Sequence, residues 1–351
     1  MIIFIVGTLA LNSELQTPMQ FEYTDRYITS IENMQETLDR YGVAVIPNVL
    51  DEKEVISAQN QMWDLLETLT KKFEVPIERK SPSTWKSFYD LMPMHSMLIQ
   101  HHSVGQSQVV WDVRQNEKVV DVFSKLWKTK PEDLLCSFDG LSIHLPPEIT
   151  KRGWFRNTWY HTDQSYFRND LECYQGFVTM YDVNDNDGTL TVLEGSHNYH
   201  SEFAKFLEID KLDKKSKEYK DLKTDWYKLT PEQQDFYMKK GCKMTCVKCP
   251  KGSLVLWDSR TIHAGKEPDK TRKEQNTRFI VYVCMTPRKL CTKTNLKKKQ
   301  KAFEDMRMTS HWPHKPKLFG KSPRTYGKLL QPTEKLPAPK LTEIGKRLAG
   351  F

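Results

Sequence analysis

The sequence predicts a mainly β fold with flanking helices, in which the strands form an antiparallel sandwich or barrel. Up to about residue 130, apolar residues recur at helical spacing, whereas after about residue 135 short runs rich in Val, Ile, Thr, Phe and Tyr alternate with turn residues. Many short strands separated by turns are typical of sandwiches and barrels. The chain has 351 residues, 38% of them hydrophobic and 11% aromatic, which is enough for a packed core.

Three helices are expected before the strand-rich region. Residues 30–41 form an amphipathic segment that Gly42 can end, because glycine favours the backbone of a helix C-terminus. Residues 51–72 begin with acidic side chains and end with two lysines, an order that suits the helix dipole, and their apolar residues recur at helical spacing. Residues 116–128 are expected to form the third helix.

The strand-rich region consists of short runs with β-branched and aromatic residues, bounded by Gly, Asn, Asp and Pro. These runs are residues 141–147, 160–167, 174–183, 188–196, 243–249, 252–265 and 278–287.

A lysine-rich segment, residues 199–240, interrupts these strands. Thr230 suits the cap of a helix, Pro231 its first position and Gln233 the capping box. Gly241 then provides a stop. We therefore expect a helical insertion that covers one end of the sheet as a lid.

The chain divides by charge near its C-terminus. The net charge is +8, but residues 287–351 hold 17 Lys and Arg against 4 Asp and Glu, which leaves the rest of the chain at −5. We therefore predict a main domain over residues 1–290 and a basic extension over residues 291–351, with a helix at about 295–308 and a Pro- and Lys-rich tail. Such a run is usually solvated, although it could recruit nucleic acid or an acidic partner.

The cysteines and the termini indicate an intracellular protein. Seven cysteines, an odd number in a long chain, imply no disulfide framework and favour a reducing, cytoplasmic location. The N-terminal apolar run is too short to span a membrane and lacks the basic start of a signal peptide, so we expect a buried strand or a loosely packed end, or a working chain that starts near Met19. The C-terminal Leu-Ala-Gly-Phe is not a peroxisomal signal, and no other targeting signal is evident.

The stretch WYHTDQSY, residues 159–166, places two metal-ligand side chains on one strand. Side chains alternate between the faces of a strand, so His161 and Asp163 point the same way and Thr162 the opposite way. Two histidines and one carboxylate, with coordination positions left open, are typical of non-haem Fe(II) oxygenases. The pattern therefore needs a second histidine.

The candidates for this second histidine are His144, His197, His200 and His263. His263 lies in the run 252–265, which we expect to form one long strand with Trp257 on the same face. His197 and His200 follow a glycine and are expected in a surface turn. We therefore expect His263 to complete the site.

Fe(II) enzymes of this class use 2-oxoglutarate, whose distal carboxylate needs a cation. Arginine suits this task because its guanidinium grips a carboxylate with two parallel hydrogen bonds. Arg278 opens the last strand, and a hairpin after His263 would bring the two strands side by side. Arg272 is the alternative, but it lies in a polar loop and is expected to face solvent.

A competing motif is formed by Cys242, Cys246 and Cys249, whose spacing matches a radical S-adenosylmethionine iron–sulfur site. Such a site belongs in a loop after an early strand of an α/β barrel, whereas these residues lie late in the chain among expected strands. Cysteine is also a common buried residue. We therefore expect core cysteines here.

Four segments, YHTDQSYF, GTLTVLEGSHNYH, GSLVLWDSRTIHAG and RFIVYVCMTP, resemble in this order the phytanoyl-CoA dioxygenase family of Fe(II)/2-oxoglutarate-dependent oxygenases. RYGVAVIPNVL, followed by a long helix, resembles the N-terminal segment of that family. The resemblance spans about residues 35–288, apart from the insertion. It implies a double-stranded β-helix core of the jelly-roll or cupin type. It also implies iron bound by His161, Asp163 and His263, with 2-oxoglutarate held by Arg278.

The same resemblance implies further details of the site. Gln175 and Phe177 would face the pocket, with Gln175 against the cosubstrate, although both could simply pack in the core. Members often carry a basic residue before the Pro-Pro that precedes the metal strand; here it is Leu145, which removes the basis for a second cosubstrate contact. Halogenating relatives replace the iron-binding carboxylate with a small residue, so Asp163 favours hydroxylation.

These observations predict an Fe(II)/2-oxoglutarate-dependent dioxygenase. It would hydroxylate a C–H bond of a small-molecule or lipid-like substrate, while 2-oxoglutarate reacts with O2 and is decarboxylated to succinate. The first alternative is the same chemistry on a nucleic acid or protein recruited by residues 291–351. The second is a β-helix binding protein without catalysis.

Overall fold

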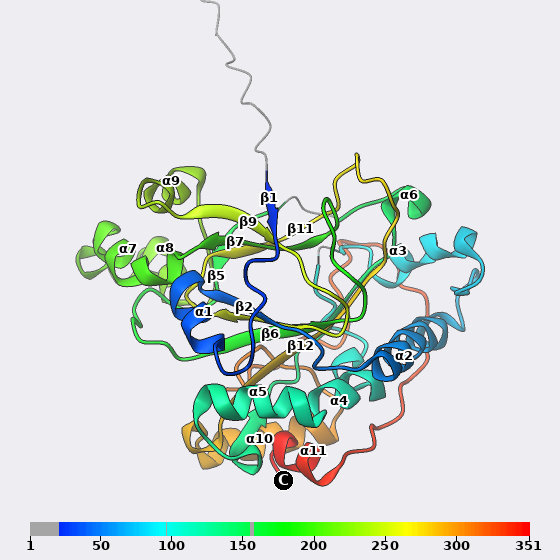
Figure 1. Ribbon diagram of the computed structural model, residues 1–351. Coiled ribbons are helices and arrows are strands. Elements are labelled where there is room, and N and C mark those ends of the chain that lie inside the picture. Colours follow the sequence, from blue (N-terminus) through cyan, green and yellow to red (C-terminus); the bar gives the residue numbers. More distant parts are fainter. Residues whose placement is uncertain (1–20, 96, 155–157) are drawn as a thin grey trace, which may run out of the picture.

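The computed structural model describes residues 21–95, 97–154 and 158–351. Its centre consists of two six-stranded sheets that face each other (Figure 1). The first sheet has the order β1-β9-β7-β11-β5-β8, and the second has the order β2-β10-β6-β12-β3 with β4 also paired to β12. Apart from the parallel pair β1–β9, the paired strands are antiparallel. This arrangement confirms the predicted mainly β fold with a double-stranded β-helix core.

The strands are short, as the sequence predicted. The first sheet contains β1 (Glu22–Thr24), β5 (His161–Thr162), β7 (Thr189–Glu194), β8 (Tyr227–Lys228), β9 (Lys243–Val247) and β11 (His263–Lys266). The second contains β2 (Val43–Ile46), β3 (Leu134–Cys136), β4 (Leu141–His144), β6 (Tyr174–Thr179), β10 (Leu254–Asp258) and β12 (Arg278–Pro287). Apolar side chains of the two sheets meet in one cluster that includes Val45, Phe177, Val192 and Val255.

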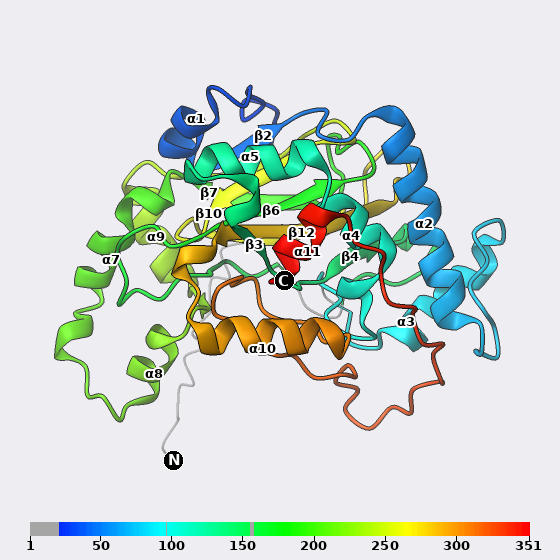
Figure 2. The same ribbon diagram turned by 90° about the horizontal axis from the view of Figure 1, so that it is seen from below.

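Helices cover the outer face of the second sheet. They include α2 (Glu52–Thr70), α4 (Gln108–Arg114), α5 (Glu117–Trp127), α10 (Lys293–Glu304) and α11 (Glu343–Ala349). Figures 1 and 2 show α4, α5, α10 and α11 gathered on the side of the molecule where β12 lies. There are also two short helices, α3 (Phe88–Leu91) and α6 (Pro147–Thr150). The helices and the second sheet share the largest apolar cluster, so the sheet is buried on both faces.

The expected helix boundaries are close to the observed ones. The first helix, α1 (Met34–Tyr41), ends at Gly42, whose φ of 76° is left-handed and whose N–H donates to the Leu38 carbonyl. In α2, the Asp51 side chain accepts from the Glu54 N–H, and the Glu54 side chain accepts from the Asp51 N–H. This reciprocal pair satisfies two amides that a helix start leaves without partners.

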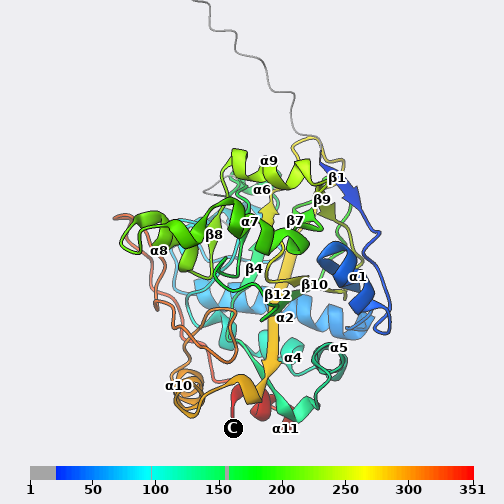
Figure 3. The same cartoon turned by 90° about the vertical axis from the view of Figure 1, so that its left-hand side faces the viewer.

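The segment 199–240 is a helical insertion, as predicted. It contains α7 (His200–Phe206), α8 (Lys217–Lys223) and α9 (Pro231–Lys239), which lie together beside the first sheet (Figures 1 and 3). The predicted capping box of Thr230 and Gln233 is present at the start of α9. The insertion also contributes β8, whose residue Lys228 pairs with His161. It therefore extends the sheet that carries the expected metal ligands.

The basic C-terminal segment packs against the rest of the protein. Ala302, Met308 and Leu348 belong to the main apolar cluster. Lys299 is fully buried, and its ammonium group donates to the Cys136 carbonyl of β3. The interpretation of residues 291–351 as a solvated extension is therefore wrong. A domain boundary at residue 290 and recruitment of nucleic acid by this segment stay predictions.

We expected the run 252–265 to form one long strand, but it forms two strands, β10 and β11, in different sheets. The chain turns between β10 and β11: the Thr261 N–H donates to the Asp258 carbonyl at 2.9 Å, and the Arg260 guanidinium pairs with the Asp258 carboxylate at 2.6 Å. This turn uses neither glycine nor proline, so alternation of side chains gave no sign of it.

The predictions for the N-terminal apolar run fall on residues 1–20, which lie outside the described part of the chain. Within the described part, no helix combines the length and the apolar composition that crossing a bilayer requires.

Candidate active site

Three buried side chains meet where β5 and β11 pair in the first sheet. His161 of β5 and His263 of β11 are direct cross-strand partners, and their ring centroids lie 4.3 Å apart. Asp163 follows β5, and its carboxylate lies 3.7 Å from His161 Nε2 and 3.3 Å from His263 Nε2. One ligand atom from each residue lies within 4.8 Å of the others. The structure thus brings together the three residues that the sequence singled out.

The two imidazoles are oriented by carbonyl groups that lie two residues earlier in the chain, just before β5 and β11. His161 Nδ1 faces the Trp159 carbonyl at 3.3 Å, and His263 Nδ1 faces the Thr261 carbonyl at 2.9 Å. A ring that donates through Nδ1 keeps a lone pair on Nε2, the nitrogen that here points to the carboxylate. Burial, together with His263, lowers the pKa of His161 to about 3, which keeps this ring neutral as a metal ligand must be.

The Asp163 carboxylate is held in its ionised form. Burial alone would raise its pKa, but the neighbouring His161 and His263 outweigh burial and hold the pKa below its usual range. The Gln175 amide of β6 also donates to Asp163 Oδ2 at 2.9 Å. The structure thus gives Gln175 a carboxylate partner that the sequence did not indicate, whereas its contact with 2-oxoglutarate stays a prediction. Thr162 points away from this group, as expected, and bonds to the Ser259 carbonyl.

Arg278 approaches the same cavity from the opposite sheet. It opens β12, which pairs with β4 and β6 rather than with β11, so the expected hairpin next to His263 is wrong. Its guanidinium is buried, lies 5.3 Å from the centre of the Phe177 ring and has no ion-pair partner among the described residues. Its Nε also lacks a hydrogen bond to any described residue. A buried cation without a carboxylate of its own is suited to an anionic ligand.

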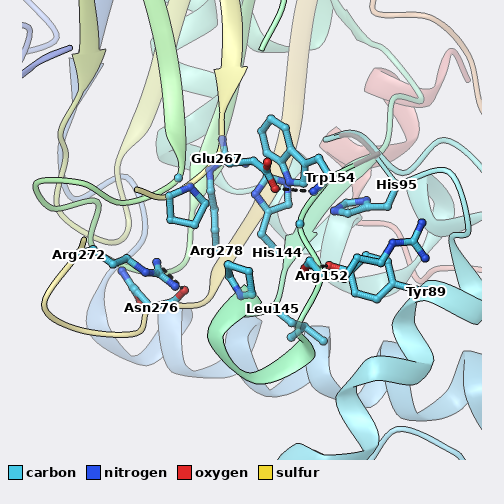
Figure 4. A pocket seen from close by; sticks show the side chains of 14 residues that line it. Tyr89, His95, His144, Leu145, Arg152, Trp154, Glu267, Arg272, Asn276 and Arg278 are labelled. Carbon is cyan, nitrogen blue, oxygen red and sulfur yellow. Dashed lines mark hydrogen bonds between the residues drawn. The ribbon is translucent and has the colours of Figure 1, made fainter. Parts of the chain in front are cut away.

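Arg272 is already neutralised. Contrary to expectation it is buried, with a side chain 3% exposed. It pairs with Glu148 at 2.6 Å and with Asp187 at 3.0 Å. Figure 4 shows Arg272 beside Asn276, on the other side of a small pocket from His144, with Arg278 reaching into the pocket between them. Of the two arginines, Arg278 is therefore the one whose guanidinium can donate hydrogen bonds to a bound ligand.

A cavity of about 670 Å³ opens beside the three residues. The β core contributes Asp139, Trp159, Phe177, Trp257, Arg278 and Tyr282. The insertion contributes Lys223, Thr224, Asp225 and Trp226, and the C-terminal segment contributes Ser310, His311, Trp312, Lys315, Lys317 and Phe319. No pattern in the sequence indicated that residues 310–319 form part of this wall, because they show no strand or helix period.

The other candidate histidines serve the fold. His144 pairs across the sheet with Arg278, and burial keeps its pKa well below the usual range. His197 and His200 are buried and not at the surface as expected; their Nε2 atoms face the carbonyls of Asp39 and Ser165. None of these rings belongs to the cluster of metal-ligating groups found among the described residues.

Cys242, Cys246 and Cys249 do not form a metal site in the described part of the chain. All are buried and free, and burial raises the pKa of each thiol. Cys246 lies within β9, and the backbone of Cys249 forms an isolated antiparallel β-bridge with that of Val183. These cysteines are core residues, as expected.

Comparison with known proteins extends these findings. The model of the phytanoyl-CoA dioxygenase (PhyH) family matches residues 38–273. "Ava biosynthesis cluster protein O" of Aspergillus versicolor is 29% identical over 283 residues, which cover 80% of this chain and 86% of that protein. Among solved structures, a Salmonella typhimurium LT2 protein has a TM-score of 0.56 at 15% identity and covers 93% of this chain and 86% of its own. An Escherichia coli hypothetical protein has a TM-score of 0.54 at 15% identity, with 93% and 85% covered. The two structures share the fold of this chain.

Proposed function

This chain belongs to the phytanoyl-CoA dioxygenase family, and from this membership we propose that it is a dioxygenase that hydroxylates a C–H bond of a small-molecule substrate. Fe(II) and 2-oxoglutarate are the cofactors of this family, as the sequence predicted. The observation that carries the proposal is the convergence of His161, Asp163 and His263 in a cavity that also contains Arg278.

The residues present suit the proposed cofactors. Two neutral imidazoles and one carboxylate, within 4.8 Å of one another, are the donor set of a non-haem Fe(II) site with open positions. Arg278, without a carboxylate partner among the described residues, would hold the distal carboxylate of 2-oxoglutarate. When bound, these cofactors supply the O2-dependent oxidation, coupled to the decarboxylation of 2-oxoglutarate to succinate. Because Asp163 supplies a carboxylate ligand, the site favours hydroxylation over halogenation.

The protein's own groups would orient these partners. The carbonyls of Trp159 and Thr261 fix the two rings, and Gln175 fixes the carboxylate. Trp226 of the insertion packs edge-on against Trp159 with the ring centres 5.3 Å apart, and both line the cavity. Such aromatic walls exclude water from the reacting atoms and position an apolar substrate.

The test is an anaerobic titration of the protein with Fe(II) and 2-oxoglutarate. The visible charge-transfer band of the complex is the readout. We expect the band in the unaltered protein and its loss in His263→Ala, because one of the three ligands is removed. His101→Ala is the matched control: His101 lies outside the cavity, with Nδ1 facing the Gly320 carbonyl, and its removal should leave the band intact. Absence of the band from the unaltered protein, or its persistence in His263→Ala, would refute the proposed site.

A further inference from the structure

A further acidic side chain, Asp139, lines the cavity. This residue lies in the loop between β3 and β4 and is 5% exposed. The hydrogen bond found for its carboxylate is a long one, 3.4 Å from the Ser137 hydroxyl. Asp139 is therefore a buried acid whose carboxylate makes no strong internal hydrogen bond within the described chain.

Neighbouring cations do not neutralise Asp139. Burial raises the pKa of Asp139, whereas His311 and Arg114 lower it. His311 forms no ion pair with Asp139 in the described chain, and the Arg114 guanidinium donates to the backbone carbonyls of Gly105, Asp139 and Tyr282. The Asp139 carboxylate forms no ion pair with any described residue. A buried carboxylate usually costs folding free energy unless a donor or a cation satisfies it. The Asp139 carboxylate can therefore accept a hydrogen bond from a ligand in the cavity.

The C-terminal segment adds polar groups to the same cavity. Ser310 Oγ, His311 Nε2 and Trp312 Nε1 are buried, and no described residue satisfies their hydrogen-bonding capacity. All three residues line the cavity. Buried polar groups in folded proteins almost always have partners, so three consecutive exceptions in one wall indicate a ligand. These residues lie beyond the segment that the family model matches, which ends at residue 273.

The walls of the cavity favour a flat apolar body. Trp159, Trp226, Trp312 and Phe319 supply aromatic surface from the β core, the insertion and the C-terminal segment. Aromatic side chains bind aromatic ligands by stacking and edge-on contacts. The exposed rim carries Lys223, Lys315 and Lys317, none of which bonds to Asp139.

We propose that Asp139, together with the strip Ser310–Trp312, forms the specificity site for an aromatic substrate that presents a nitrogen-bound proton to the Asp139 carboxylate. This inference rests on the proposed function, because it assigns the substrate class of the same cavity. A carboxylate accepts hydrogen bonds and offers none, so the complementary substrate group is a protonated amine or an amide N–H. A site of this kind rejects analogues that lack the donor, since they leave the buried acid unpaired.

The experiment compares three naphthalene probes by calorimetry, on protein loaded with Fe(II) and 2-oxoglutarate in the absence of oxygen. 1-Naphthylmethylamine offers an ammonium group, 1-naphthylacetamide a neutral N–H donor, and 1-naphthylacetate no donor. We expect at least one of the two donor probes to bind about tenfold or more tightly than the acetate, as for hydrogen bonds to a charged group. The stronger of the two then tells whether the substrate nitrogen is protonated or neutral.

Variants of Asp139 test the assignment to this residue. Asp139→Leu should abolish the preference for both donor probes, and Asp139→Asn should weaken the amine more than the amide, because it removes the charge and keeps an acceptor. Asp225→Asn is the matched control: Asp225 lines the same cavity but is ion-paired with Arg168, so the preference should stay unchanged. If Asp139→Leu fails to fold, the amine result for Asp139→Asn decides.

The outcomes separate this inference from the proposed function. Equal binding of all three probes, no binding by any of them, an unchanged preference in Asp139→Leu, or unchanged binding of the amine in Asp139→Asn would overturn the specificity site. The charge-transfer band is recorded on the same samples. Its absence would refute the proposed cofactor site without bearing on how the probes bind, whereas a normal band with no preference would refute the specificity site alone.

Discussion

At the residue scale, each group of the candidate site has its orientation set by a neighbour that is not itself a ligand. His161 and His263 each face a carbonyl two residues earlier in the chain, at Trp159 and Thr261. Asp163 instead depends on Gln175 from the opposite sheet. Partners of this kind fix the direction of a ligand's lone pair and so contribute to metal affinity.

We predict that Gln175→Leu lowers the affinity for Fe(II) by about tenfold, the lower end of what loss of such a partner costs. The Asp163 carboxylate would lose the amide that orients it. Phe177→Leu is the control, because Phe177 lines the same cavity and does not bond to Asp163. Anaerobic metal titration measures both variants, and equal affinities would contradict the positioning role of Gln175.

The two buried arginines are predicted to behave oppositely when replaced by methionine. Arg278→Met should raise the KM for 2-oxoglutarate at least about tenfold without loss of stability, because the guanidinium has no carboxylate partner to abandon within the described chain. Arg272→Met should lower the free energy of unfolding by about 3 kcal/mol, because Glu148 and Asp187 lose their cation. Steady-state kinetics and urea denaturation distinguish the two. A stability loss confined to Arg278→Met would contradict the assignment of Arg278 to ligand binding and of Arg272 to internal ion pairs.

At the element scale, the turn that separates β10 from β11 decides how the site is assembled. The sequence predicted the composition of the strands and the triad residues, but it merged these two strands because alternating side chains continue across the turn. The turn sends β10 into one sheet and β11 into the other. As a result, Trp257 and His263 reach the cavity from different sheets, with ring centres 5.3 Å apart.

Gly42 packs directly against this turn. Its φ is 76°, and a Cβ there would collide with Thr261 Oγ1 and lie 2.6 Å from His197 Nδ1. We predict that Gly42→Ala lowers the free energy of unfolding by about 3 kcal/mol, from the left-handed backbone and the collision together.

Gly327→Ala provides the comparison for this prediction. Gly327 has a φ of 93°, and a Cβ added there would meet no described atom within 4 Å. The substitution should therefore cost only the backbone term, about 1 kcal/mol. Thermal or urea unfolding measures both variants. Equal losses would mean that the contact with the turn contributes nothing.

At the scale of the whole molecule, the basic C-terminal segment is part of the folded body. Lys299 of α10 is buried at the Cys136 carbonyl, and its ammonium lies 3.8 Å from the centre of the Phe138 ring. Burial lowers the pKa of Lys299 to about 7. The lysine is thus neutral in the folded protein, and still charged in the unfolded chain, between pH 7 and its ordinary value of 10.5.

This depressed pKa predicts a pH-dependent stability. Below pH 7 both states carry the proton and the cost of the buried charge is complete; between pH 7 and 10.5 the unfolded state binds more protons, so stability rises with pH. Relative to Lys299→Met, the unaltered protein should gain about 2 kcal/mol of unfolding free energy from pH 7 to pH 9. Urea denaturation at both pH values measures this gain. Lys301 is exposed on the same helix, so relative to Lys301→Met the unaltered protein should show no such gain.

The sequence by itself determined the chemistry-bearing residues and most of the elements, because these depend on local spacing. The i, i+2 spacing of His161 and Asp163 predicts that they point the same way, Asp51 and Thr230 mark helix starts, and short β-rich runs mark the strands. Tertiary structure alone decided from which elements the surrounding groups reach the triad. Arg278 and Gln175 reach it from the opposite sheet, and Asp139, His311 and Trp312 join the cavity through packing of segments far apart in the chain. Such contacts arise from burial of apolar surface between elements, which leaves no periodic signal in the sequence of either partner.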